Sequence, residues 1–78
     1  MNEIHEREIF RRYVAVQFSG LYNMITEADS AWEMAEINQN EYFYVQDHYK
    51  ELCDKFPDTY EEARKVGEKF SKVLYGGE

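Results

Sequence analysis

The stretch VQDHYKELCDKFPDTYEEARKVGEKF, residues 45–70, carries two helical patterns on either side of a single proline. In its first part, apolar residues recur every three or four positions, the spacing that places side chains on one face of an α-helix. Pro57 disfavours helical backbone at the residue before it, so a helix over residues 41–56 is expected to stop there. The inward face of this helix is predicted to comprise Val45, Tyr49, Leu52 and Phe56.

The second part predicts another helix, over residues 59–75. Asp58 can accept hydrogen bonds from the first backbone amides, and Glu61 stands three positions later, as in a variant of the capping box. Gly67 lies inside this helix and costs about 1 kcal/mol relative to alanine, which a close helix crossing would explain. The predicted inward stripe comprises Tyr60, Ala63, Val66, Phe70, Val73 and Leu74.

Two more helices are predicted before residue 41. One has an apolar row of Ile9, Tyr13 and Val16, and the other groups Trp32 with small alanines, which is typical of a close helix contact. Ser19-Gly20 is interpreted as the joint between them, without chemistry of its own, with Asn23 as the preferred cap of the next helix, although Thr26 could serve as well. The predicted fold class is therefore all-α, a small compact bundle of about four helices over residues 3–18, 24–37, 41–56 and 59–75.

Length and composition predict a single helical domain over residues 1–78. Folding at this size buries only roughly 60% of the unfolded chain's surface, so support from a partner subunit is common. Cys53 is the only cysteine, which excludes an internal disulfide and fits a reducing compartment. The charged amino-terminal stretch resembles no signal segment, and no apolar run approaches the about 20 residues of a membrane span. A cytoplasmic protein is expected.

Charge is distributed unevenly along the chain, whose formal net charge is −7. No Lys or Arg occurs between Arg12 and Lys50, whereas six acids do. A charged helix face usually serves solubility. However, Asp29, Glu33 and Glu36 follow one another at helical spacing, where like charges repel, and this favours a face that meets a basic surface on another protein. Both interpretations stay open.

Several function classes are disfavoured. Nucleic-acid binding needs a basic patch, but Arg7, Arg11 and Arg12 are balanced by neighbouring glutamates. His48 is interpreted as a surface or boundary histidine, because no Glu-x-x-His metal pair accompanies it. Cys53 lacks a well-placed base and is interpreted as an inert thiol. We therefore expect neither catalysis nor a metal or other cofactor.

A protein-binding surface is the remaining class of site. The stretch from Asn40 to Tyr49 is the most aromatic part of the chain, and tyrosines near acids are common at recognition surfaces. Rings of this kind can equally fill a small core. The predicted contact residues are Glu27, Asp29, Glu33, Glu36, Glu41, Tyr42, Tyr44 and Asp47, with the two tyrosines as aromatic anchors.

Residues 9–52 resemble a group of very short proteins from phages and prophages. The likeness rests on Ser19, Gly20, Asn23 and Met24, a Ser-Gly-x-x-Asn-Met helix joint, followed by the aromatic segment EYFYVQDHYKEL. The helix expected after Pro57 departs from the pattern of that group. The resemblance implies no activity for any residue. It implies a phage-type accessory protein, a class in which many members, anti-CRISPR and other anti-defence proteins among them, inhibit a host protein.

Together, these observations predict a small acidic protein that binds a host protein with a basic surface, such as a nucleic-acid-binding or defence protein, and inhibits it. The alternative is a self-associating structural or adaptor module, in which exposed rings pack against a second copy to form a homodimer.

Overall fold

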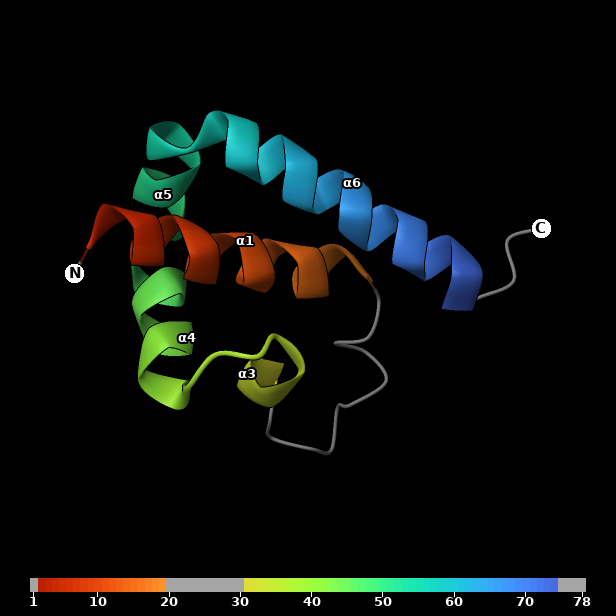
Figure 1. Cartoon of the computed structure of the whole chain (residues 1–78), viewed down its shortest axis with the longest axis horizontal. Helices are drawn as coiled ribbons and strands as arrows, with labels where there is room; N and C mark the ends of the chain where they lie inside the picture. The colour runs from red at the N-terminus through yellow and green to blue at the C-terminus, as the bar shows by residue number, and fades with distance from the viewer. Residues whose placement is uncertain (1, 20–30, 75–78) are drawn as a thin grey trace.

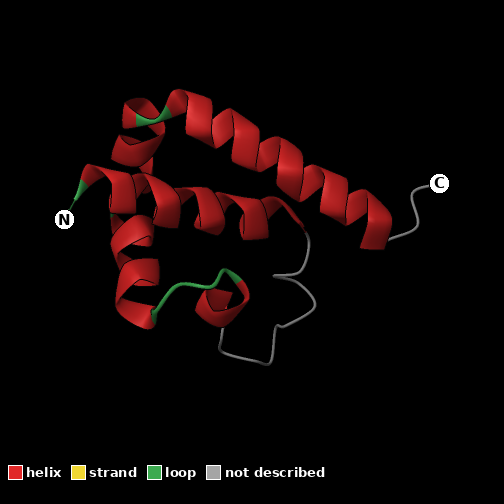
Figure 2. Cartoon of the chain, viewed as in Figure 1, coloured by secondary structure: helices red, strands yellow, loops and turns green. Residues whose placement is uncertain are grey.

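The computed structural model describes residues 2–19 and 31–74, and in this part the chain is a compact all-α bundle without strands (Figures 1 and 2). The predicted fold class is therefore confirmed. The helices are α1 (Glu3–Ser19), α3 (Ala31–Met34), α4 (Gln39–Asp47), α5 (Tyr49–Lys55) and α6 (Pro57–Leu74).

The pairing of α1 with α6 is the main contact of the bundle. The two helices run side by side in the same direction, while α4 and α5 lie across the amino-terminal half of α1 (Figure 1). The ring of Phe10, on α1, lies between α5 and α6, with ring centroids 6.0 Å from Tyr49 of α5 and 6.5 Å from Tyr60 of α6. Gly67 lies where α6 crosses α1, directly against the backbone of Ala15, so the predicted close crossing is confirmed.

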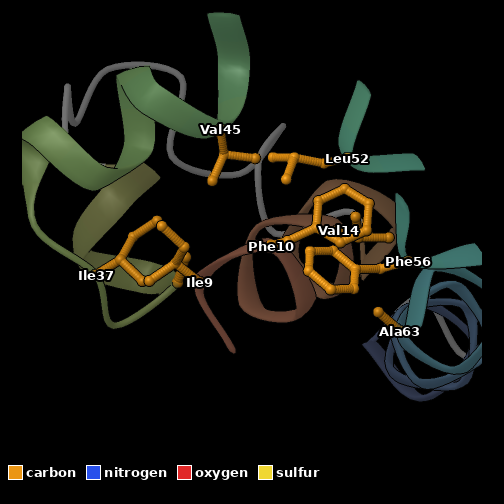
Figure 3. Close-up of a cluster of buried hydrophobic side chains, with 9 residues drawn as sticks. Ile9, Phe10, Val14, Ile37, Val45, Leu52, Phe56 and Ala63 are labelled. Carbon is orange, nitrogen blue, oxygen red and sulfur yellow. The ribbon is translucent and has the colours of Figure 1, made fainter. Parts of the chain in front are cut away.

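The core forms where these helices meet. Phe10 and Val14 of α1 are fully buried, and Val45 and Leu52 reach them from α4 and α5 (Figure 3). Ile37, in the turn before α4, packs beside Ile9 on the other side of α1 (Figure 3). Among the residues that the structure describes, the buried hydrophobic side chains are Ile9, Phe10, Val14, Ala35, Ile37, Val45, Leu52, Phe56 and Ala63.

The helix predicted over residues 41–56 is two helices. It starts two residues earlier, at Gln39, and breaks at His48, whose backbone has φ −113° and ψ 21°. Both the backbone N–H and the ring Nδ1 of His48 lie within hydrogen-bond distance of the Tyr44 carbonyl oxygen, at 3.1 and 2.9 Å. The imidazole also stacks on the Tyr44 ring at 4.4 Å. The His48 side chain thus contacts the last turn of α4 at the residue where that helix ends.

The start of the last helix also differs from the prediction. Pro57 is its first residue and Phe56 ends α5, so Asp58 and Glu61 do not form the expected capping box. Proline suits this first position because its missing N–H would have no partner inside the helix.

The inward face of α6 is only partly as predicted. Ala63 is buried, but Val66 is 45% exposed and Phe70 is 55% exposed. The buried row consists instead of the small residues Thr59, Ala63 and Gly67, which let α6 approach α1 closely.

The first half of the helix predicted over residues 24–37 lies outside the described residues, as do Gly20 and the caps Asn23 and Thr26 proposed for the joint. Ser19 is the last residue of α1, is buried, and donates a hydrogen bond from its hydroxyl to the Val16 carbonyl. The described part of this helix, α3, ends at Met34, earlier than predicted.

Candidate protein-binding surface

The turn after α3 holds one of the predicted contact residues, Glu36, in a left-handed conformation with φ 62°. The backbone N–H of Ile37 bonds to the Trp32 carbonyl and that of Glu36 to the Glu33 carbonyl, at 2.9 and 3.0 Å. This is the Schellman arrangement, in which the left-handed position is usually glycine. A glutamate there is strained by about 1 kcal/mol.

Arg12 of α1 holds this turn against the first helix. Its guanidinium donates to the backbone oxygen and to the carboxylate of Glu36, at 3.0 and 3.2 Å. The Glu36 side chain remains 77% exposed despite these contacts. The stretch between Arg12 and Lys50, which contains no base, is thus partly neutralised by Arg12, a residue 24 positions before Glu36. A count of charges along the chain could not reveal this pair.

Glu41 is committed to the start of α4. Its backbone N–H donates to the Asn38 side chain at 2.7 Å, and its carboxylate accepts from the Asn38 backbone N–H at 3.0 Å, a complete capping box. The other carboxylate oxygen lies 2.6 Å from Nε2 of His5. The bond from the Asn38 backbone, followed by the contact with His5, lowers the pKa of Glu41. This carboxylate therefore stabilises the fold and is not free for a partner.

A charged cleft of about 190 Å³ lies between α1 and the turn before α4. It is below the size of ordinary small-molecule sites, about 300 Å³ or more. Its charges satisfy one another, since Glu8 accepts hydrogen bonds from Arg11 and Arg12, which lower the pKa of Glu8 to about 2. The cleft thus fastens the turn to α1 and offers little to a ligand. It is lined by His5, Glu8, Ile9, Arg12, Glu36, Ile37 and Glu41.

Neither predicted tyrosine anchor is free. The ring of Tyr42 packs against Tyr13 and Trp32, at centroid distances of 5.2 and 6.2 Å. The Tyr44 hydroxyl donates a hydrogen bond to the buried carboxylate of Glu6, and this bond raises the pKa of Tyr44.

The Glu6 carboxylate joins three helices. In addition to the bond from Tyr44, it accepts one from Nζ of Lys55 at 2.8 Å. The bonds from Lys55 and from Tyr44 lower the pKa of Glu6 in spite of its burial. A buried carboxylate satisfied by two donors ties α1 to α4 and α5.

On α4, the aromatic residue that points outward is Phe43, which the sequence did not predict as a contact residue. It is 44% exposed and lies at the centre of the exposed face of α4. Its helical neighbours three and four positions away are all exposed polar residues. We call this set the α4 outer face: Gln39, Asn40, Phe43, Gln46 and Asp47.

The remaining predicted contact residues stand as follows. Asp47 is exposed and belongs to the α4 outer face, and Glu33 is exposed on α3. Glu27 and Asp29 lie outside the described residues. The structure therefore leaves Glu33, Glu36 and Asp47 as exposed carboxylates on α3, the following turn and α4, whereas it commits Glu41 to the fold.

Other chemistry is limited in the described part of the chain. Burial raises the pKa of the half-buried Cys53 thiol, which disfavours the reactive thiolate. Within residues 2–19 and 31–74, no three His, Cys, Asp or Glu side chains are grouped to bind a metal ion. None of the described helices is both long and apolar enough to pass through a bilayer.

No protein-family model, curated protein or solved structure matches this chain.

Proposed function

We propose that this chain acts by stoichiometric protein–protein binding, with the α4 outer face seated on a basic surface of its partner. The observation that carries the proposal is the exposure of Phe43 on a helix with no Lys or Arg. An exposed aromatic residue inside a polar rim is the usual arrangement of a binding hot spot, where the rim excludes water from the anchor. The exposed ring and the absence of bases on α4 thus both favour a partner with a basic surface.

The exposed carboxylates supply the electrostatic part of the proposal. Glu33, Glu36 and Asp47 lie on elements without any base, so a positively charged partner would be attracted and oriented before contact. Such attraction raises the association rate and falls with added salt. Binding is therefore expected to weaken as the salt concentration rises.

The partner proposed is a host protein that binds nucleic acid or takes part in defence, acting in the host cytoplasm. Its basic groove would accept the carboxylates in place of phosphates, and this competition would inhibit it. The resemblance to short phage and prophage proteins supports this choice. The proposed action is inhibition by occupancy and requires no catalytic residue or cofactor.

Affinity capture from host lysate, with tagged variants washed at low and high salt, tests the proposal. The parent is compared with Phe43→Ala and with Glu33→Lys/Glu36→Lys, and the captured protein is then titrated against each by calorimetry. The matched control is Glu51→Lys/Asp54→Lys, which changes two exposed acids of α5 and alters the net charge equally. We expect at least about a tenfold loss of affinity for each test variant and near-parental affinity for the control. A captured protein bound equally by all four would overturn the proposal.

Glu36→Gly separates binding from folding. Glycine relieves the left-handed strain, so the free energy of unfolding should rise by about 1 kcal/mol, less the small contribution of the exposed Arg12–Glu36 pair. Affinity for the captured protein should fall, because the carboxylate is gone. A variant that is both more stable and a poorer binder cannot be explained by partial unfolding, whereas unchanged affinity would remove Glu36 from the contact surface.

A further inference from the structure

The α4 outer face places a carboxylate beside its exposed ring. Phe43 and Asp47 are four positions apart on α4, so their side chains are neighbours on one side of the helix. Because Cα–Cβ bonds tilt toward the amino terminus of a helix, the Asp47 side chain leans back toward the turn that carries Phe43. Both residues are exposed. A single group from a partner can therefore contact the ring and the carboxylate together.

The ring of Phe43 is held in place by the chain's own aromatic residues. Tyr42 contacts it at a centroid distance of 5.5 Å, with the two ring planes nearly perpendicular at 82°. Tyr42 in turn packs against Tyr13 of α1 and Trp32 of α3. A side chain that is already fixed loses little conformational entropy when a partner binds. The exposed part of Phe43 is thus a preorganised aromatic surface.

The charge around this pair favours a cation. α4 contains no Lys or Arg, and Asp47 takes part in none of the ion pairs formed within residues 2–19 and 31–74. Asp47 is also the last residue of α4, where the backbone carbonyls give the helix end a partial negative charge. The face of an aromatic ring is negative as well. The carboxylate, the helix end and the ring therefore all attract positive charge within about one helical turn.

We propose that Phe43 and Asp47 together bind one arginine side chain of the partner protein, with the guanidinium stacked on the ring and its N–H groups donating to the carboxylate. This inference rests on the proposed function and names the group that the α4 outer face recognises on a basic partner. A guanidinium is planar and weakly hydrated, so it can lie on a ring while its edge donates two parallel hydrogen bonds to a carboxylate. The ammonium of lysine is a compact, strongly hydrated charge without that geometry. Arginine is therefore preferred to lysine.

Peptide probes separate arginine recognition from general attraction between opposite charges. Two short peptides of equal length and charge are used, one alternating arginine with glycine and the other alternating lysine with glycine. Each is titrated into the isotope-labelled full chain and followed by NMR chemical shifts. We expect the arginine peptide to shift the Phe43 ring and Asp47 amide resonances and to bind about two- to fivefold more tightly than the lysine peptide. Equal affinities for the two peptides would overturn the proposal.

Variants of exposed residues locate the preference. Phe43→Leu should bring the ratio of the two affinities to about one, whereas Phe43→Tyr, which keeps the ring face, should retain the preference. Asp47→Asn should weaken the arginine peptide more than the lysine peptide, because it removes the paired acceptor. The matched controls are Phe70→Leu and Asp54→Asn, an exposed phenylalanine of α6 and an exposed aspartate of α5, and neither should alter the ratio. A preference that survives Phe43→Leu, or that Asp54→Asn removes, would overturn the proposal.

The peptide titration and the capture experiment can fail separately. If the captured protein loses affinity for Phe43→Ala but the two peptides bind equally, the α4 outer face binds a basic partner without selecting arginine. The proposed function then stands and the arginine inference is wrong. If the arginine peptide is preferred but no captured protein depends on Phe43, arginine recognition is supported and the proposed function is wrong.

Discussion

Replacing Gly67 by alanine should destabilise this protein, although alanine is the better helix former. A Cβ atom at this position would lie 2.5 Å from the carbonyl oxygen of Ala15 and 2.9 Å from Cβ of Phe18. Ordinary contacts of this kind begin at 3.4 Å, so α1 and α6 would have to separate by about 1 Å. The obstructing oxygen belongs to the backbone of a helix and cannot rotate away as a side chain would.

The magnitude follows from two opposing effects. Alanine in place of a helical glycine contributes about 1 kcal/mol in favour of folding. Overpacking of a close-packed contact costs typically about 1–3 kcal/mol, and a backbone obstruction belongs at the upper end. The free energy of unfolding should therefore fall by about 2 kcal/mol. For a domain of this size, such a loss lowers the melting temperature by roughly 10 °C.

Thermal and urea unfolding followed by circular dichroism measure this effect. Lys65→Ala is the matched control, since it introduces alanine at an exposed position of the same helix and should change stability by less than about 0.5 kcal/mol. A Gly67→Ala variant that melts at or above the parental temperature would refute the reasoning. In that case the close approach of α1 to α6 would not depend on the missing side chain.

Three further predictions concern polar contacts made by residues of α1, α4 and α5. Tyr44→Phe should lower the free energy of unfolding by about 1.5 kcal/mol, because Glu6 loses a charge-assisted hydrogen bond; denaturant titration with no change in midpoint would contradict this. Asn38→Ala should cost about 1 kcal/mol by removing the cap of α4, and an unchanged melting temperature would argue against the capping box. The chain should lose stability on acidification: the pKa of Glu8 is about 2 against a usual 4.5, and that of Glu6 is also lowered, so the stabilisation is complete above about pH 4.5 and is lost as pH falls toward 2. Melting temperatures that stay constant from pH 5 to 2.5 would exclude that linkage.

The extents of the two long helices, α1 and α6, could be predicted from sequence. The predicted bounds of α1 differ by one residue from Glu3–Ser19, and those of α6 by two residues at its start. The break at His48 could not be predicted, because the apolar spacing continues through it and carries no sign of the change in backbone geometry there. The exposure of Val66 and Phe70 was missed for a related reason. The small residues at the crossing determine which side of α6 faces α1, whereas the apolar spacing predicts that the larger residues Val66 and Phe70 form the core.

In the base-free stretch between Arg12 and Lys50, a count of charges along the sequence overstates the exposed negative charge. Residues far apart in sequence can neutralise one another, as Arg12 does with Glu36 and His5 with Glu41. The exposed acidity that remains is smaller than the sequence indicates, and it lies on α3, the following turn and the end of α4.

The choice between Tyr44 and Phe43 could have been made from the sequence with one further argument. Glu6 stands three and four positions before Ile9 and Phe10, so it shares the inward face of α1, where an unpaired carboxylate is costly. An inward carboxylate requires donors from the opposing helix, and a tyrosine hydroxyl provides one that a phenylalanine cannot. Assigning Tyr44 to Glu6 turns the neighbouring Phe43 about 100° away, toward solvent. The buried acid of α1 thereby determines which ring of α4 is left for a partner.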